Sequence, residues 1–218
     1  MTRGLIITLP RHDDVTEYLS FFSKSVISEA EDRSVPFKKL EDGEANKKDF
    51  EKVVQKRDYK LIVFNGHGTP TSICGYGDLP IVEEKVNDKI LADKITYARS
   101  CDSACSLGLS IFGDCEKGCF IGYDLPFQFY CDKTWVGNPA KDMIAPLFLE
   151  PSNAVPIFIL KGKTVREAYE SSRRAMLKNM KKALRRADAE SLAIAEALWN
   201  NYDGQVLIGD GSVKLDSS

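Results

Sequence analysis

Short, unbroken runs of apolar residues recur along this chain, each bounded by turn-forming residues. Runs without polar alternation are typical of strands covered on both faces, as in a parallel sheet. The sequence predicts strands at about residues 4–9, 59–65, 94–100, 118–123 and 205–210, with a weaker candidate at 35–40.

Between these runs, apolar positions recur at helical spacing on a charged background. Asp13 and Asp14 are suited to cap a helix that runs to about residue 31. Residues 69–78 are rich in glycine and predict a loop or small hairpin, and residues 135–149 predict a mixture of helix and loop broken by prolines. Further helices are predicted at about residues 46–57, 83–92, 103–112 and 164–199, the last with a break near residue 187.

The alternation of strands and helices predicts an α/β fold with right-handed crossovers and a mostly parallel central sheet flanked by helices. The chain has 218 residues and no linker-like stretch rich in proline, glycine or serine. We therefore expect residues 1–218 to form a single domain.

Composition narrows the classes of partner. Apolar residues make up 43% of the chain, enough for a full-sized core, and the formal net charge of −2 gives no reason to expect nucleic acid or a membrane surface as a partner. The apolar run after Met1 is too short for a signal peptide, and none is long enough to cross a bilayer. We expect a cytoplasmic protein whose six cysteines are reduced.

Two of the predicted strands end at residues that carry chemistry. One apolar run leads into Gly66, His67 and Gly68, and another leads into Cys101. Neighbouring parallel strands end at the same sheet edge, which is where ligands bind in open α/β sheets. We therefore expect His67 and Cys101 to meet there, with the two glycines allowing a tight turn and leaving room for a ligand.

A thiol becomes a good nucleophile when an imidazolium or a helix N-terminus stabilises its thiolate. Cys101 is predicted to have both, with His67 on the neighbouring strand and the helix at 103–112 directly after it. The other histidine, His12, lies beside the capping aspartates and is interpreted as a surface or capping residue. Cys105 would project from within the predicted helix, so Cys101 is the preferred nucleophile.

The same arrangement predicts an oxyanion hole. The backbone N–H groups of Gly68 and Cys101 would point into the space where a tetrahedral intermediate places its charge. The residue that orients His67 is not identifiable from the sequence, and a dyad of two residues can suffice. The opposing interpretation is an ordinary turn histidine and a buried cysteine, but their occurrence together at two strand ends favours catalysis.

The remaining cysteines raise the question of a metal. Cys115 and Cys119 are separated by three residues, and Cys105 or Cys131 could supply further ligands. This spacing differs from the usual zinc knuckle, so buried or incidental thiols are the preferred interpretation, and no cofactor or structural metal is expected.

The predicted helix after residue 164 carries a dense set of bases. Two interpretations stay open, a solvated outer face and a docking surface for an acidic partner. The bases are Arg173, Arg174, Lys178, Lys181, Lys182, Arg185 and Arg186.

These motifs resemble the caspase-like superfamily of cysteine peptidases, which includes caspases, metacaspases, separase, clostripain, gingipains and bacterial CHAT domains. The resemblance rests on an apolar strand ending in His67-Gly68 and an apolar strand ending in Cys101 followed by Asp-Ser-Ala. Residues 197–211 also look like the closing strand and turn of CHAT and gingipain-type domains. The resemblance implies a three-layer caspase-like fold and peptide-bond hydrolysis by the Cys–His dyad without a metal. It also implies that a protein substrate binds as an extended strand.

The resemblance also implies substrate-binding residues. The residue two before the nucleophile often lines the pocket for the side chain that precedes the cut bond, and here it is Arg99. A guanidinium there favours an acidic partner and hence cleavage after Asp or Glu. Asn65 and Asp124 are further candidates at the same edge. If cleavage instead followed Arg or Lys, Asp124 or Asp78 would be the pocket candidate.

CHAT domains are usually fused to repeat or sensor regions, and this chain has room only for a peptidase core. The resemblance therefore implies either release from a longer protein or a separate regulatory protein partner, in a setting such as bacterial defence. Two other classes of function stay open. One is a catalytically idle domain that binds proteins through the basic helix, and the other is a redox or metal-binding role for the additional cysteines.

Overall fold

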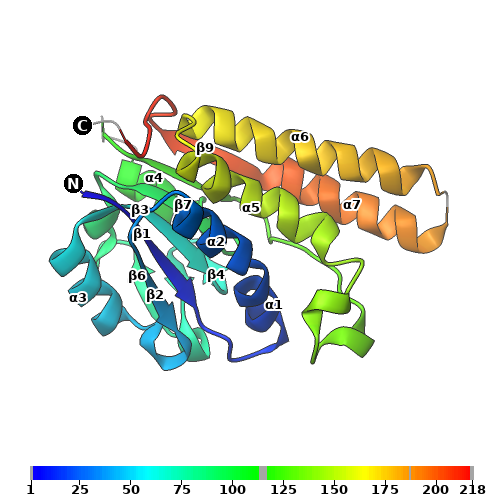
Figure 1. Cartoon of the computed structure of the whole chain (residues 1–218), viewed down its shortest axis with the longest axis horizontal. Coiled ribbons are helices and arrows are strands. Elements are labelled where there is room, and N and C mark those ends of the chain that lie inside the picture. Colours follow the sequence, from blue (N-terminus) through cyan, green and yellow to red (C-terminus); the bar gives the residue numbers. More distant parts are fainter. Residues whose placement is uncertain (1, 113–116, 187, 217–218) are drawn as a thin grey trace.

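The computed structural model describes residues 2–112, 117–186 and 188–216. A six-stranded sheet forms its centre, with the strand order β2-β1-β3-β7-β8-β9 (Figure 1). The first five strands in this order are parallel, and β9 is antiparallel to β8. The strands are β1 (Thr2–Leu9), β2 (Phe37–Glu41), β3 (Tyr59–Asn65), β7 (Ile95–Arg99), β8 (Cys119–Tyr123) and β9 (Gln205–Gly209).

Helices cover both faces of this sheet, so the predicted α/β class with a mostly parallel sheet is confirmed. One face packs against α2, α5 and α6, and the other packs against α3, α4 and a small antiparallel sheet. Seven α-helices are described: α1 (Asp14–Phe22), α2 (Lys24–Asp32), α3 (Lys47–Arg57), α4 (Leu107–Phe112), α5 (Pro146–Leu160), α6 (Val165–Leu184) and α7 (Ala189–Gly204).

Shorter elements connect the strands and helices of the large sheet. The small sheet follows β3 and has the order β4-β5-β6. Its strands are β4 (Gly68–Thr69), β5 (Ser72–Cys74) and β6 (Pro80–Glu83), and the 3₁₀ turns are η1 (Asp42–Glu44), η2 (Tyr76–Asp78), η3 (Asp88–Leu91), η4 (Lys133–Trp135) and η5 (Pro139–Lys141).

Strand β3 shows why an unbroken apolar run forms a central strand. All seven of its residues are buried. Because side chains alternate between faces, Leu61 and Val63 join one core cluster, while Ile62 and Phe64 join the cluster on the opposite face. Both faces therefore require apolar residues, and the strand shows no polar alternation.

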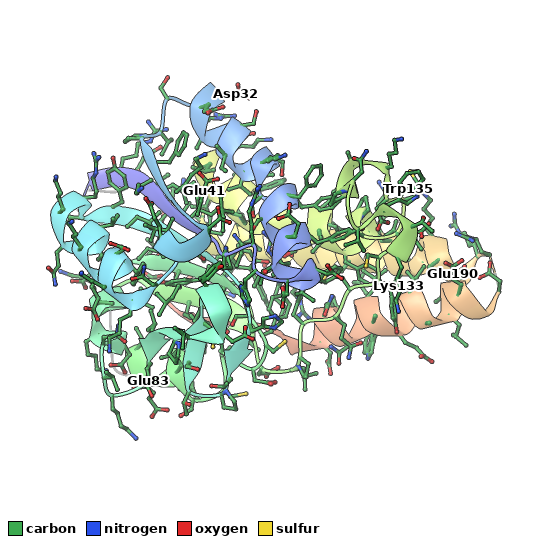
Figure 2. The ribbon with its side chains drawn as sticks, turned by 90° about the horizontal axis from the view of Figure 1, so that it is seen from below. Asp32, Glu41, Glu83, Lys133, Trp135 and Glu190 are labelled. Atoms are coloured by element: carbon green, nitrogen blue, oxygen red, sulfur yellow. The ribbon has the colours of Figure 1, made fainter. Side chains whose placement is uncertain are left out.

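The last two long helices form an antiparallel hairpin that extends beyond the sheet (Figure 1). Their contact contains Met176 from α6 and Ile194 and Leu198 from α7, together with Phe148 from α5. Figure 2 shows Lys133 and Trp135 on the segment that precedes α5. Among the described helices, none combines the length and the apolar composition needed to cross a membrane.

Three helix predictions require correction. The helix expected from Asp14 to residue 31 is two helices that meet at Ser23. The Ser23 hydroxyl donates to the Leu19 carbonyl and accepts a hydrogen bond from the buried guanidinium of Arg99. The helix expected at 83–92 is a strand end, a turn and η3, since Lys85 adopts a left-handed φ of 61°. Helical spacing alone reveals neither interruption.

The helix expected at 103–112 begins later, at Leu107. The backbone N–H groups of Ser106 and Leu107 both donate to the carbonyl of Pro70, and that of Ala104 donates to Tyr123. These residues form turns that connect α4 to the small sheet and to β8. The mixture of helix and loop predicted at 135–149 was expected to be interrupted at Pro146, but Pro146 is the first residue of α5, which is sufficiently apolar to be buried between α1, α2 and α6.

Candidate functional site

The pairing of β3 with β7 brings the two predicted catalytic residues to one edge. In the parallel register, Asn65 is opposite Arg99, an offset of 34 residues. His67 and Cys101 are also 34 residues apart, so each lies two residues after its member of the Asn65–Arg99 pair. Neighbouring strands are about 4.8 Å apart. The two side chains therefore leave the sheet from equivalent places on adjacent strands.

The two loops that follow these strands contact one another closely. The Ser100 hydroxyl donates to the backbone carbonyl of His67 at 2.7 Å. A β-carbon added to Gly68 would lie 2.0 Å from the Ser100 Oγ and 2.7 Å from the Cys101 carbonyl oxygen. Gly66 has a φ of 154°, and a β-carbon there would lie 2.4 Å from the Cys74 carbonyl oxygen. The glycines on both sides of His67 are thus required by close backbone approach.

Asp13 orients the His67 ring. The Nε2 atom of His67 lies 2.7 Å from Asp13 Oδ2, while Asp13 Oδ1 accepts hydrogen bonds from the backbone and hydroxyl of Thr16 as the N-cap of α1. Partial burial would raise the pKa of Asp13, but the bonds from Thr16 and His67 outweigh it and lower the pKa to about 2. Asp13 is therefore an anion that can stabilise an imidazolium.

The sequence predicted Asp13 only as a helix cap, and that role is confirmed. Its second role was missed, because the contact joins residues 54 positions apart through the packing of α1 beside β3. The signal available in the sequence was weak. The capping aspartate follows β1, a strand whose carboxyl end lies beside that of β3.

Cys101 is partly buried, and its thiol is not activated in this structure. Its Sγ lies 3.9 Å from the Phe127 carbonyl oxygen, which accepts from it. Burial raises the pKa of the Cys101 thiol, and Asp102 adds to this effect. Within the described chain, no hydrogen bond joins Sγ to the His67 ring. The expected support from a helix N-terminus is wrong, since α4 begins six residues later, at Leu107.

The backbone around Cys101 has an unusual conformation. Asp102 adopts a left-handed φ of 55°, which aspartate tolerates better than most residues. Across the described residues, the N–H of Cys101 donates to no backbone carbonyl. This N–H fits the predicted oxyanion hole, for which the participation of the Gly68 N–H stays a prediction.

Arg99 and Asn65 lie beneath the site, in the interior. Arg99 is 1% exposed, and its guanidinium donates to Asn65 Oδ1 at 2.5 and 3.0 Å. The other acceptors are Asn153 Oδ1 at 2.6 Å, Ser23 Oγ at 2.7 Å and the Leu19 carbonyl oxygen at 3.4 Å. The Asn65 amide donates in turn to the Thr8 carbonyl. In this arrangement the guanidinium ties β7 to β3, α5 and the α1–α2 junction, and it does not reach the surface between His67 and Cys101.

The far side of Cys101 carries acidic groups. Asp124 is exposed at the carboxyl end of β8, and its backbone carbonyl accepts from the Cys105 thiol at 3.4 Å. Burial raises the pKa of Cys105, and the carboxylates of Asp102 and Asp124 raise it further. The candidate Asp124 is therefore at the predicted edge, one strand away from Cys101.

The other cysteines are dispersed among the described elements. Cys119 is buried within β8, where burial raises its pKa, and Cys131 is beside Tyr18. Cys115 lies outside the described residues, so the spacing of Cys115 and Cys119 has no structural counterpart here.

His12 lies next to the candidate base, which the sequence did not predict. The ring centroids of His12 and His67 are 6.1 Å apart. His12 Nε2 lies 3.1 Å from Asp78 Oδ1, and His67 Nε2 lies 3.9 Å from the same oxygen. Among the described residues, this trio is the one group of three whose atoms could together hold a metal ion.

The fold and the site define an α/β protein with cysteine, histidine and aspartate at the carboxyl edge of a parallel sheet. Comparison with known protein families finds no match, and comparison with curated protein sequences finds none either.

Proposed function

We propose that this protein is a cysteine endopeptidase of the caspase-like superfamily, with Cys101 as nucleophile and His67 as base. The observation that carries the proposal is the register of β3 and β7, which gives His67 and Cys101 equivalent positions beyond adjacent parallel strands. The order of strand, His-Gly, strand and Cys matches the family that the sequence resembles. A mostly parallel sheet with helices on both faces is compatible with this assignment.

In the proposed reaction, His67 takes the proton of the Cys101 thiol as Sγ attacks the carbonyl carbon of the cut bond. Asp13 stabilises the imidazolium that forms, through the contact at Nε2. The oxyanion is held by the Cys101 N–H. The imidazolium then returns the proton to the leaving amine, and water activated by His67 hydrolyses the thioester.

The raised pKa of Cys101 and the missing hydrogen bond to His67 describe a resting state. Activation would shorten the distance between thiol and imidazole when substrate or a regulatory partner binds. The basic face of α6 is our candidate contact for an acidic partner protein. Its exposed residues Arg174, Lys178, Lys181, Lys182 and Arg185 line one shallow hollow with Leu177. By analogy with CHAT domains, we place this regulation in bacterial defence and in the cytoplasm.

The cleavage preference that we propose differs from the one Arg99 suggested. The Arg99 guanidinium is buried and donates hydrogen bonds to four residues in the interior. For Arg99 to select Asp or Glu before the cut bond, it would have to leave these partners. The exposed carboxylate of Asp124 and that of Asp102 are beside Cys105, close to the nucleophile. A basic side chain, Arg or Lys, before the cut bond fits these charges better.

A second candidate is a catalytically idle domain that binds proteins. The unactivated thiol favours it, because a raised pKa and a bond to a carbonyl also suit a structural cysteine.

The test is covalent labelling with peptidyl acyloxymethyl ketones that carry Arg, Lys, Asp or Leu before the warhead, read by intact mass. We expect labelling of the wild type that is lost in Cys101→Ala and His67→Ala and kept in the matched control Cys105→Ala. The Arg and Lys reagents are expected to react fastest. Labelling that depends on Cys105 would contradict the assignment, and absence of labelling with acidic partner candidates present would favour the binding domain.

A further inference from the structure

The chain contains two histidines, and the structure brings both to one place. His12 follows β1 and His67 follows β3, and these strands are neighbours in the sheet. Their carboxyl ends therefore lie side by side, and the two rings meet edge to face with centroids 6.1 Å apart. The proposed peptidase reaction uses only His67, so the position of His12 needs a separate explanation.

A carboxylate from a third element completes the group. Asp78 Oδ1 lies 3.1 Å from His12 Nε2 and 3.9 Å from His67 Nε2. One ligand atom from each of the three residues lies within 4.8 Å of the other two. Two imidazoles and a carboxylate are the donor set that suits Zn²⁺ and similar divalent transition metals, with a water molecule to complete a tetrahedron.

The His12 side chain and the backbone at Asp78 are held in position by their surroundings. The backbone N–H of His12 donates to Thr16 Oγ1 at 3.0 Å, and its side chain is only 12% exposed. Asp78 follows Gly77, and both have left-handed φ values, of 59° and 66°. The turn is fastened by a bond from Tyr76 N–H to the Ala45 carbonyl. These restraints reduce the conformational freedom that is lost when a metal binds.

Local charge also favours a cation. Asp13 Oδ2 lies 2.7 Å from His67 Nε2, so a second carboxylate is available beside the trio. Two carboxylates offset the charge of a divalent ion. The two carboxylates do not contact a lysine or arginine in the described structure; their hydrogen bonds and ion pairs are to His12, His67 and Thr16.

We propose that His12, His67 and Asp78 form a binding site for Zn²⁺ or a similar divalent transition metal, which competes with the catalytic role of His67. Nε2 of His67 is the atom nearest Asp78, and an imidazole that binds a metal through Nε2 carries its remaining proton on Nδ1, so no lone pair is left to take the thiol proton. Metal binding follows from the geometry alone, and its inhibitory effect rests on the proposed peptidase function. The site would make the enzyme reversibly sensitive to free zinc.

The first experiment measures binding without reference to activity. Tag-free protein is stripped of metal and titrated with Zn²⁺ against a chromophoric chelator, and with Co²⁺ followed by visible absorption. We expect one equivalent, and an affinity at least about 100-fold weaker in His12→Gln and Asp78→Asn. Cys101→Ala and the surface control Asp32→Asn should bind as the wild type does. The cobalt spectrum should lack a thiolate charge-transfer band.

Two results would overturn the proposal. One is wild-type protein that binds no metal at micromolar concentration. The other is binding that is lost in Cys101→Ala and kept in His12→Gln, which would place the metal on the thiol. Folding of each variant is checked by circular dichroism, and the conservative pair His12→Gln and His12→Asn guards against a single misfolded variant.

The second experiment measures inhibition. For each variant, peptide cleavage with zinc is divided by its own rate without zinc. We expect inhibition of the wild type that a chelator reverses, and at least a tenfold higher inhibitory zinc concentration for His12→Gln. Equal inhibition of both proteins would show that zinc acts elsewhere, at the thiol. If the protein binds zinc but has no peptidase activity, the metal site is supported and only the proposed peptidase function is rejected.

Discussion

At the scale of single residues, Asp13 has two partners that can be separated by mutation. Asparagine caps helices about as well as aspartate but carries no charge. Asp13→Asn should therefore fold with little loss of stability, yet lower kcat/KM by roughly 100-fold or more because the imidazolium loses its counter-charge. Asp13→Ala should show the same kinetic loss and a further destabilisation of about 1 kcal/mol. Peptide cleavage and thermal unfolding measure the two effects. Equal activity of Asp13→Asn and wild type would exclude the orienting role.

Asp13 also predicts part of the pH dependence of stability. Its pKa is lowered from 3.8 to about 2 in the folded state. A depressed carboxyl pKa contributes stability above pH 3.8, which is lost as the pH falls toward 2. Because the side chain is more than one-third exposed, solvent screening limits this contribution to about 1 kcal/mol. Urea unfolding between pH 5 and pH 2 should show a smaller acid loss in Asp13→Asn, and parallel curves would contradict the assignment.

The thiol of Cys101 predicts a second pH dependence. Burial raises its pKa, so less thiolate is present at pH 7 than the roughly 3% expected for an unperturbed cysteine with a pKa near 8.5. Iodoacetamide should therefore alkylate Cys101 slowly at pH 7 and faster as the pH rises above 9, as followed by peptide mapping. A rate that is already maximal below pH 7 would indicate a preformed thiolate–imidazolium pair instead of the resting state described here.

At the scale of elements, the loops after β3 and β7 form one unit. Gly68→Ala would place a methyl group 2.7 Å from the Cys101 carbonyl oxygen, and that backbone atom cannot move without displacing the nucleophile. We expect about 1–3 kcal/mol of destabilisation and at least a tenfold loss of kcat/KM. Gly43→Ala is the matched control, because open space surrounds that position. It should be neutral or stabilising by about 0.5 kcal/mol. Similar effects of both changes would show that the contact is unimportant.

The late start of α4 changes how the nucleophile is understood. Residues 102–106 form turns whose N–H groups bond Pro70 and Tyr123, so no helix N-terminus faces the thiol. In the proposed mechanism, activation of the thiol then depends on His67. For the same reason, binding of a partner that moves either loop could switch the site on.

At the scale of the whole molecule, Arg99 connects the main elements. Its guanidinium bonds to groups on β3, α5 and the α1–α2 junction, all of them neutral acceptors. Arg99→Lys and Arg99→Met leave Asn65 and Asn153 without their donor, and we expect each to cost about 3 kcal/mol. For a domain of this size the melting temperature should fall by about 6–12 °C. The exposed control Arg174→Gln should change stability by no more than about 0.5 kcal/mol. A small effect of Arg99→Met would free this residue for another role.

Several features of the fold follow from the sequence because their causes are local. Apolar runs predicted β1, β3, β7 and β8, and helical spacing predicted α3 and the pair α6 and α7. The positions of His67 and Cys101 at strand ends were also visible, since each directly follows an apolar run. These predictions depend on side-chain period and turn residues, which act within a few positions along the chain.

Only the tertiary structure decided which residues meet at the site. The contacts of His67 with Asp13, His12 and Asp78 join three segments, residues 12–13, the loop after β3 and η2, which the strand order and the packing of α1 bring together although they are far apart in sequence. The direction of Arg99 into the interior was likewise decided by acceptors on three separate elements. The sequence by itself determined the strands and the positions of His67 and Cys101 beyond their ends, because these depend on local apolar pattern. The tertiary structure decided their neighbours, protonation and access, because these depend on long-range packing.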